Sequence, residues 1–252
     1  MKCYNDLAKL YDELIYEDIN YKAWANIILE EMKKYNISFN SYLDLACGTG
    51  NMMRELARSF RKNRGIDLSQ DMLCVAEDKL REIGVNAKFA CLDISDFSLR
   101  EKFDLVTCCL DSTNYLLEED DIVGYFESVY EVLEEEGLFV FDINTEYKLR
   151  NVLGNNTFTY DNEEIFYAWE NSIEDDIVDM YLTFFIKEGN MYNRFDENHT
   201  ERVYSVELLE ELLDRVGFEV IKKRDRYEFD VKEDSERIAF FCKKKIDWVE
   251  GE

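Results

Sequence analysis

The spacing of hydrophobic residues along the chain changes repeatedly between the period of a helix and that of a strand. Near the N-terminus, apolar residues recur three or four positions apart at 5–14 and 21–34, which predicts two helices. Further along, short apolar runs alternate with stretches of helical spacing. The runs predict five strands, at residues 42–45, 64–67, 87–91, 103–110 and 138–143. The stretches between them predict helices at residues 52–60, 69–83 and 122–133.

Strands that alternate with helices are typical of a parallel, doubly wound sheet. The run at 103–110 is almost continuously apolar, as expected of a strand that is covered on both faces. Ligands of such sheets bind at the carboxyl ends of the strands, where the strand order reverses. Four segments follow predicted strand ends and are therefore candidates for a binding site: Ala46–Gly50, Asp67, Asp93 and Leu110–Asn114.

The alternation stops after the fifth predicted strand. Residues 151–161 are polar and are predicted as a linker. Three β-rich stretches separated by hairpin-like turns follow, at residues 165–173, 177–187 and 191–201. We expect these stretches to form an antiparallel β cap, inserted into the main domain at residues 151–201.

The C-terminal part returns to the earlier pattern. A helix is predicted at 205–216 and is closed by Gly217, because glycine suits the left-handed end of a helix. Two last strands, at 218–226 and 238–244, are expected to pair as a hairpin. The predicted fold class is α/β: a Rossmann-like, doubly wound sheet of seven strands, mostly parallel with an antiparallel C-terminal strand. Its domain is expected to comprise residues 1–150 and 202–252.

The charge of the chain narrows the choice of partners. Its 252 residues include 30 Lys and Arg against 56 Asp and Glu, a net charge of −26. Proteins that bind nucleic acid neutralise phosphates with a basic stripe, and the sequence shows none. Nucleic acid and anionic membranes are therefore not expected as partners. An acidic protein attracts cations, which favours a small cationic or amine substrate, although solubility alone also accounts for the charge.

Cysteine and histidine usage bears on location and metal binding. The seven cysteines are scattered without a Cys-x-x-Cys pair, and His199 is the only histidine. This pattern favours a reducing cytoplasm and predicts neither disulfides nor a metal site. No apolar run approaches the ~20 residues of a membrane helix, and acidic residues interrupt the N-terminus where a signal peptide would need an apolar core. We expect a monomer or a homodimer.

The residues with the clearest chemical meaning form a glycine turn between a strand and a helix, Asp44-Leu45-Ala46-Cys47-Gly48-Thr49-Gly50. The glycines let a ligand approach the main chain, and the following helix offers free N–H groups at its positive end. Asp67 ends the next strand, where a carboxylate can accept hydrogen bonds from ribose hydroxyls. Together the two features predict a ligand that contains a nucleoside, whereas a glycine turn alone also fits a turn without a ligand.

Two nucleotide ligands fit the turn less well. A dinucleotide fold needs a third small residue so that helix and strand can pack closely, and Met53 stands at that position. Asp44 is unsuited to a pyrophosphate but suits a cation such as a sulfonium amino acid. A phosphate loop of the Walker type is excluded, because no Gly-Lys-Ser/Thr occurs.

The turn resembles motif I of the class I S-adenosylmethionine (SAM)-dependent methyltransferases, usually Asp/Glu-x-Gly-x-Gly-x-Gly, with Ala46 in place of the first glycine. The order and spacing match over most of residues 42–144. The further matching segments are Gly65–Ser69 with Met72 and Leu73, Cys91–Ile94, Phe103–Val106 and Leu133–Phe141. Other positions resemble a small-molecule subgroup that includes glycine/sarcosine and amino-sugar N-methyltransferases: Tyr11, Asp12, Tyr21, Trp24 and Arg202–Ser205.

The resemblance implies SAM as the cofactor and assigns its contacts. Asp44 and the turn would hold the methionine part, Asp67 the ribose, and Leu68, Met72 and Asp93 the adenine. Simple core packing is the alternative for each apolar contact. The cofactor-binding residues implied in this way are Tyr11, Trp24, Asp44, Ala46, Cys47, Gly48, Thr49, Gly50, Asp67, Leu68, Met72, Asp93, Ile94, Leu110 and Asp111.

The implied reaction is an in-line methyl transfer to a nitrogen or oxygen of a small acceptor. Because the sulfonium already activates the methyl group, the protein mainly has to align the nucleophile, at about 3–3.5 Å. A general base is optional for a neutral amine and needed for a hydroxyl. Candidate catalytic residues are Asp111, Tyr115, His199 and Arg202, with Asn114 and Asn144 nearby. A lone histidine in a polar strand is also typical of a solvated surface.

Two other functions stay open at the level of sequence. An aminopropyl transferase favours paired acids after the fourth strand, whereas Ser112 follows Asp111 here. A non-catalytic SAM-binding or interaction protein would use the aromatic residues of the cap as a partner surface.

Overall fold

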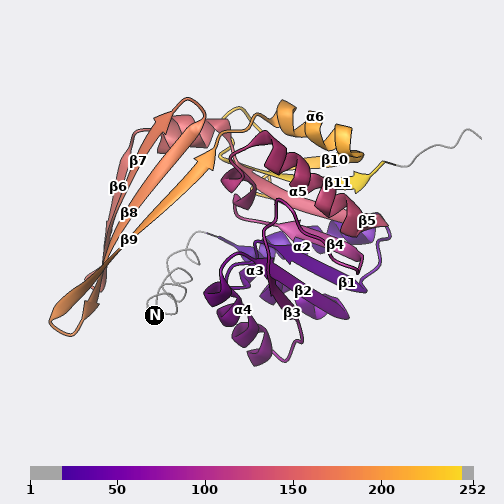
Figure 1. Ribbon diagram of the computed structural model, residues 1–252, viewed down its shortest axis with the longest axis horizontal. Helices are drawn as coiled ribbons and strands as arrows, with labels where there is room; N and C mark the ends of the chain where they lie inside the picture. Colours follow the sequence, from indigo (N-terminus) through magenta and orange to yellow (C-terminus); the bar gives the residue numbers. More distant parts are fainter. Residues whose placement is uncertain (1–18, 246–252) are drawn as a thin grey trace, which may run out of the picture.

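The computed structural model describes residues 19–245. A seven-stranded sheet carries helices on both faces, and a second, four-stranded sheet projects from it (Figure 1). The large sheet contains β1 (Ser41–Leu45), β2 (Lys62–Asp67), β3 (Lys88–Cys91), β4 (Phe103–Cys108), β5 (Leu133–Asn144), β10 (Phe218–Asp225) and β11 (Arg237–Lys244). The α-helices are α2 (Tyr21–Lys34), α3 (Asn51–Leu56), α4 (Gln70–Glu82), α5 (Glu119–Val132) and α6 (Val206–Val216). The helix predicted at 5–14 lies outside the described residues.

The strand order of the large sheet is β10-β11-β5-β4-β1-β2-β3. β1 pairs in parallel with β2 and with β4, so the order reverses between β1 and β4. β11 runs antiparallel to both of its neighbours, β5 and β10. The predicted fold class, a mostly parallel seven-stranded sheet with an antiparallel C-terminal strand, is confirmed.

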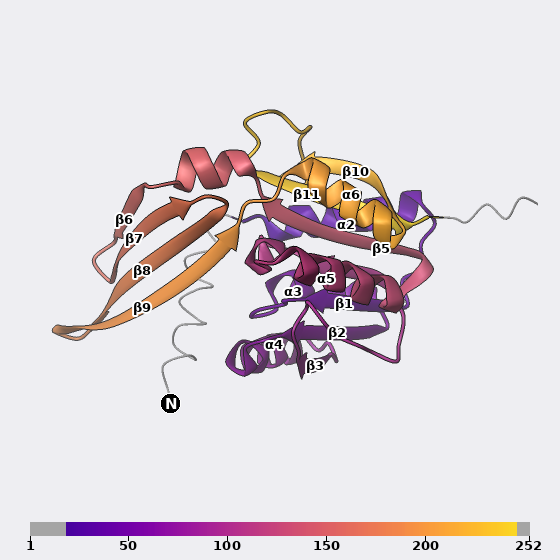
Figure 2. The same cartoon turned by 45° about the horizontal axis from the view of Figure 1, so that its top comes forward.

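The strands of this sheet alternate their side chains between two hydrophobic layers. On one face Phe139 and Phe141 of β5 join the core formed with α5 and α6. On the other face Leu138 and Val140 join the core formed with α2 and α3. Figure 2 shows these helix pairs on opposite sides of the sheet. All four side chains are fully buried, and each contributes roughly 1.5–3 kcal/mol to the hydrophobic stabilisation.

Capping residues mark the helix ends as the sequence predicts. The Ser69 side chain accepts a hydrogen bond from the Met72 N–H at 3.3 Å and begins α4. Gly217 ends α6 with a φ of 112°, in the left-handed region. The helix predicted at 52–60 is shorter, because a 3-10 turn, Ala57–Ser59, replaces its last part.

The four-stranded sheet contains β6 (Thr157–Asp161), β7 (Ile165–Glu174), β8 (Ile177–Glu188) and β9 (Met191–Arg202), all antiparallel and in that order. The three predicted β-rich stretches are confirmed as β7, β8 and β9. The linker predicted at 151–161 is wrong, because a π-helix, Lys148–Leu153, and the strand β6 occupy it. Phe158 and Tyr160 of β6 lie opposite Trp169 and Tyr167 of β7, so long-range pairing makes this polar segment a strand.

Strand β5 also begins earlier than predicted, at Leu133 instead of residue 138. Gly137 lies in an irregular part of the strand, where the pairing with β4 shifts between Phe103 and Leu105. A Cβ on Gly137 would lie 2.8 Å from the Leu133 side chain, so the crowding there requires glycine. None of the described helices is long and apolar enough to span a membrane.

Candidate active site

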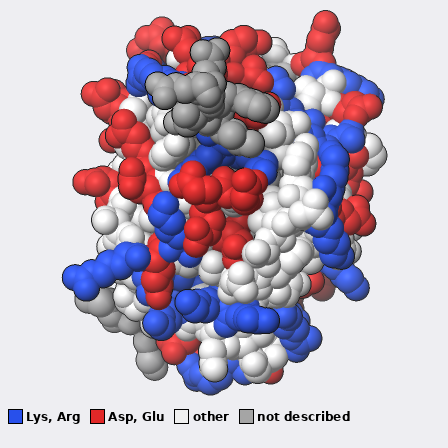
Figure 3. All heavy atoms as spheres, turned by 90° about the vertical axis from the view of Figure 1, so that its right-hand side faces the viewer, with Lys and Arg blue, Asp and Glu red and all other residues white. Residues whose placement is uncertain are grey.

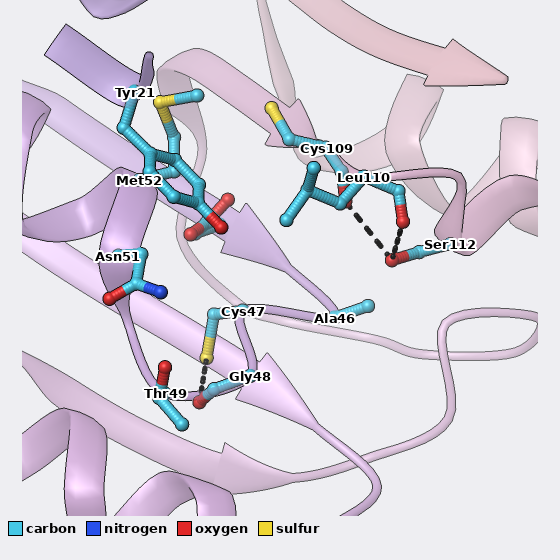
Figure 4. Close-up of a pocket in the computed structure, with 11 residues that line it drawn as sticks. Tyr21, Ala46, Cys47, Gly48, Thr49, Asn51, Met52, Cys109, Leu110 and Ser112 are labelled. Carbon is cyan, nitrogen blue, oxygen red and sulfur yellow. Dashed lines mark hydrogen bonds between the residues drawn. The ribbon is translucent and has the colours of Figure 1, made fainter. Parts of the chain in front are cut away.

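A pocket lies at the carboxyl ends of β1 and β4, next to the point where the strand order reverses. Figure 4 shows the glycine turn on one side of it and the residues after β4 on the other, with Tyr21 and Met52 near one end. The lining residues are Tyr21, Asp44, Ala46, Cys47, Gly48, Thr49, Asn51, Met52, Cys109, Leu110 and Ser112. The structure therefore brings Asp44, most of the glycine turn and Leu110 together, as a common cofactor site requires.

The glycine turn depends on its glycines for backbone shape and for space. Gly48 and Gly50 have φ values of 51° and 79°, in the left-handed region that favours glycine. A Cβ on Gly50 would lie 3.0 Å from the Cβ of Ala76 in α4, whereas a Cβ on Gly48 would meet nothing within 4 Å. Gly50 thus allows α4 to pack against the turn, and Gly48 leaves the pocket side open for a ligand.

Asp44 places a buried carboxyl group in the pocket. Its exposed fraction is 2%, and it accepts a hydrogen bond from the Thr107 hydroxyl. The Thr107 hydroxyl also lies 2.9 Å from that of Tyr42, so three polar side chains form a chain through the interior. Burial raises the pKa of Asp44 to about 7. A buried carboxylate with only hydroxyl partners suits a positively charged ligand group.

Asp67 connects the ends of β1 and β2. One of its oxygens accepts the Gly48 N–H and the other accepts the Ser69 N–H, both at 2.8 Å. A carboxylate offers about four lone-pair positions, so each oxygen keeps room for a further donor. Asp67 therefore fixes the turn and can still accept hydrogen bonds from ligand hydroxyls.

The wall opposite the turn contains an unusual backbone segment. Leu110 and Asp111 have φ values of 61° and 52°, which side chains other than glycine rarely adopt. Their N–H groups donate to the two carboxylate oxygens of Asp142, at 2.9 and 2.8 Å. Asp142 also accepts the Tyr227 hydroxyl at 2.7 Å and pairs with Arg237. These bonds end β4 two residues earlier than predicted and hold the strained wall in place.

Asp111, a predicted catalytic residue, belongs to a buried charge network. Arg237 pairs with both Asp111 and Asp142. Burial by itself would raise the pKa of Asp111, but the cations Arg237 and Lys148 hold it below its ordinary value. Burial raises the pKa of Glu201, in β9, to about 8, and the Asp111 carboxylate adds to the rise. The network joins the pocket wall to the sheet and to the cap.

Two other predicted catalytic residues meet at the junction with the cap. Tyr115 ends the 3-10 turn Ser112–Tyr115, and its hydroxyl lies 3.1 Å from Nδ1 of His199 in β9. Nε2 of His199 lies 3.2 Å from a carboxylate oxygen of Glu197, two residues earlier in the same strand. Sequence reasoning named Tyr115 and His199 but missed Glu197, whose position in an acidic chain carries no local signal.

The remaining catalytic candidates make structural hydrogen bonds. Arg202 donates to the Leu117 carbonyl oxygen at 2.7 Å. The Asn114 amide donates to the carbonyl oxygens of Asn144 and Arg202, at 3.1 and 3.0 Å, and accepts the Asn144 N–H. These bonds link the turn after β4 to β5 and to the end of the cap.

Several predicted cofactor residues lie outside the lining of the pocket. Trp24 is buried and stacks on Tyr227, with 4.4 Å between ring centroids. The residues assigned to the adenine lie beyond the end of β2 and after β3: Leu68, Met72, Asp93 and Ile94. Leu68 is 68% exposed, Asp93 is exposed and Ile94 is buried. Their roles stay predictions, and Tyr11 lies outside the described residues.

Sequence reasoning missed part of the lining. Asn51 and Met52 directly follow the motif, so their position next to Gly50 was an available signal. Cys109 directly precedes the predicted Leu110, so extending that segment by one residue would have found it, whereas Ser112 lies within the predicted segment Leu110–Asn114. The remaining lining residue, Tyr21, begins α2 and was named through the resemblance without a cofactor role.

Comparisons with known proteins agree with this architecture. Residues 43–137 match the methyltransferase domain family. A SAM-dependent methyltransferase from Clostridium acetobutylicum has a crystal structure that superimposes with a TM-score of 0.92 at 47% identity, covering 97% of this chain and all of that one. A protein of Geobacillus sp. (strain WCH70), named as a methyltransferase, is 33% identical over 96% of this chain and 99% of its own length.

Two further relatives concern amino sugars. A dTDP-3-amino-3,6-dideoxy-alpha-D-glucopyranose N,N-dimethyltransferase from Streptomyces fradiae is 31% identical over 54% of this chain and 52% of its own. A sugar N-methyltransferase from Streptoalloteichus shares the fold, with a TM-score of 0.78 at 19% identity over 94% of this chain and 93% of that one.

The fold, the pocket and the relatives define a class I SAM-dependent methyltransferase. The chain belongs to this enzyme family, and its cofactor is SAM. The residues of the pocket fit this cofactor. Asp44 offers a buried carboxyl that has no cationic partner among residues 19–245, and Gly48 leaves open space beside the turn. The carboxyl suits the positively charged end of a sulfonium amino acid, and Asp67, which lies beside Gly48 but outside the lining, offers an acceptor for sugar hydroxyls.

Proposed function

We propose that the enzyme methylates the amine nitrogen of a small polar molecule held between the cofactor pocket and the cap of residues 151–201. The observation that carries the proposal is the contact of β9 with the turn after β4: the Tyr115 hydroxyl lies 3.1 Å from Nδ1 of His199, and Ser112, in the same turn, lines the pocket. We expect a cap that is anchored there to restrict access to the pocket, which would favour a small acceptor over a macromolecule. The name of the Streptomyces fradiae relative, an amino-sugar dimethyltransferase, favours nitrogen as the acceptor atom.

Within this proposal the chain binds the cofactor through the two acids and the turn. SAM supplies an electrophilic methyl group. Asp44 accepts its positively charged amino-acid end, and Asp67 accepts the ribose hydroxyls. The rigid wall at Leu110 and Asp111 then sets the position of the acceptor, because alignment of the reacting atoms supplies much of the rate.

The experiment combines calorimetry with turnover. SAM is titrated into the protein, and a panel of amines, including amino sugars, and of alcohols is scored for release of S-adenosylhomocysteine. We expect SAM binding and turnover with at least one amine. Turnover with alcohols alone would overturn the choice of nitrogen, and SAM binding without any turnover would favour a non-catalytic role.

Asp67→Ala tests the site itself. Losing hydrogen bonds to a charged group costs about 1.5–3 kcal/mol each, so we expect SAM affinity to fall by roughly tenfold or more. The matched control is Asp71→Ala, an exposed acid in the first turn of α4, which should leave the affinity unchanged. Unchanged affinity in Asp67→Ala contradicts the proposed cofactor site.

A further inference from the structure

We propose that Tyr115, His199 and Glu197 form a proton relay that removes a proton from the acceptor amine. The inference rests on the proposed function, since it names the groups that would serve that reaction. It also assigns the cap a part in the chemistry, because β9 contributes two of the three residues.

Two short contacts connect the three side chains in the order Tyr115, His199, Glu197. The Tyr115 hydroxyl is 3.1 Å from Nδ1 of His199, and Nε2 of the same ring is 3.2 Å from Oε2 of Glu197. An ionised carboxylate only accepts hydrogen bonds, so the neutral imidazole carries its proton on Nε2. Nδ1 is then the acceptor, and the Tyr115 hydroxyl donates to it. The two rings meet edge-on, at 88° and 5.9 Å between centroids.

The burial of the three residues gives the relay a direction. Tyr115 is 43% exposed and lies three positions after Ser112, which lines the cofactor pocket. The side chains of His199 and Glu197 are 30% and 23% exposed, behind the hydroxyl. Since Tyr115 is the most exposed of the three, an acceptor that approaches from the side of Ser112 would meet its oxygen first.

The other predicted catalytic residues, Asp111 and Arg202, make contacts within the protein. Arg237 pairs with Asp111 inside the sheet, and Arg202 donates to the carbonyl oxygen of Leu117. Arg202 also has no acceptor atom, because a guanidinium only donates hydrogen bonds. Of the predicted candidates, the pair Tyr115 and His199 combines a hydroxyl at the rim with a group that can take up a proton.

The proposed step balances its protons and electrons. At neutral pH an aliphatic amine is mostly an ammonium ion and has no free electron pair. Tyr115 takes a proton from the nitrogen as its own proton moves to Nδ1 of His199, and Glu197 stabilises the resulting imidazolium. The freed electron pair of the nitrogen forms the new bond to the methyl carbon, while the electrons of the broken carbon–sulfur bond stay on sulfur. The imidazolium then releases its proton to solvent.

A magnetic resonance experiment tests the relay without any turnover. His199 is the only histidine of the chain, so its ring nitrogen signals need no assignment. We expect a proton on Nε2, a shifted Nδ1 signal in Tyr115→Phe, and loss of the Nε2 preference in Glu197→Leu, which removes the acceptor. A proton on Nδ1, or signals that neither variant changes, would overturn the relay. This readout stands even if the proposed function fails.

Kinetics with an accepted amine supply the second test. A positioned base contributes about 100-fold or more, so Tyr115→Phe and His199→Gln should lower kcat by that order, with the Kd for SAM unchanged. The defect should shrink at high pH, where the amine loses its proton unaided. Tyr181→Phe, an exposed tyrosine 49% accessible in β8, is the control and should keep wild-type kcat. A defect of equal size at every pH would indicate a merely structural role and reject the proposal.

Discussion

The charge of the pocket changes with pH because the carboxyl group of Asp44 can gain or lose a proton near neutral pH. This carboxyl is buried, no cation pairs with it in the described part of the chain, and this burial raises its pKa to about 7. A carboxyl with a raised pKa is protonated, and therefore neutral, below that pH. A bound cation favours the ionised form, so binding of SAM and loss of the proton are linked.

We therefore expect the affinity for SAM to fall as the pH is lowered through about 7, by up to about tenfold per pH unit below it, and to level off above it. Asp44→Asn should bind SAM weakly at every pH and show no such step. The measurement is calorimetric titration between pH 5.5 and 8.5, and the control, Asp67→Asn, should keep the step at reduced affinity. A wild-type affinity that does not change with pH contradicts the assignment.

Sequence reasoning at the residue scale succeeds where the site is contiguous. Asp44 and the glycines stand within seven residues, and Asp67 follows at the next strand end, so local spacing reveals them. Asp142 lies 31 residues after Asp111 and Arg237 lies 126 residues after it, with Tyr227 between them in the sequence. Their role arises from the pairing of β11 with β5, which no local pattern contains.

At the scale of elements, two reasons for a glycine in the turn can be tested separately: its left-handed backbone conformation and its close packing against α4. Gly50 and Gly84 both have left-handed φ values, 79° and 72°. A Cβ on Gly50 would meet the Cβ of Ala76 at 3.0 Å, whereas a Cβ on Gly84 would meet nothing within 4 Å. Gly48 is also left-handed and open, but it lines the pocket.

Three alanine variants test this distinction. We expect Gly84→Ala and Gly48→Ala to lose about 1–2 kcal/mol of unfolding free energy, the cost of the left-handed conformation. Gly50→Ala should lose about 1–3 kcal/mol more through overpacking. SAM affinity should fall in Gly48→Ala and stay unchanged in Gly84→Ala. Urea denaturation and calorimetry measure the two effects, and equal stability of Gly50→Ala and Gly84→Ala would refute the packing argument.

An element can be predicted from the local sequence when its formation depends little on residues that are distant in the chain. The apolar runs of β1 and β4 and the amphipathic stripe of α2 carry their own signal, and all three elements form, although β4 ends two residues before its predicted end. Strand β6 and the π-helix before it carry no such local signal, and the sequence did not predict them. Phe158 of β6 becomes half-buried only because it pairs with Trp169, and Leu149 and Leu153 of the π-helix join the same small core.

At the scale of the whole molecule, the cap and the main sheet are joined by polar contacts. Asn144, the last residue of β5, donates through its amide to Glu201 of β9 at 2.8 Å, and Lys148 donates to the Asn144 side chain at 2.9 Å. Asn144 and Glu201 are buried and Lys148 is half-buried. Hydrogen bonds that are shielded from water strongly favour the one geometry in which every group is paired. The junction therefore holds the cap at a defined angle to the pocket, which the proposed relay requires.

The excess of acidic residues affects the stability of the whole molecule. With a net charge of −26, the acidic side chains repel one another in the compact state and destabilise it. Figure 3 shows the end opposite the cap, where acidic side chains gather in the middle of the face and basic ones border them. Exposed pairs such as Lys102–Glu135, 3.5 Å apart, contribute only about 0–1 kcal/mol and weaken in salt. The buried pair of Arg237 and Asp142 is screened much less.

Added salt should therefore weaken the repulsion among the acidic side chains more than it weakens the surface ion pairs, and so stabilise the fold. The Debye length shortens from about 30 Å at 0.01 M to about 8 Å at 0.15 M, which removes long-range repulsion between acidic side chains across the molecule. We expect the Tm to rise by a few degrees over this range of sodium chloride, measured by circular dichroism. A Lys102→Gln variant should show the same rise, because its ion pair is marginal. A Tm that falls with salt would mean that surface ion pairs, not net repulsion, dominate the electrostatics of the fold.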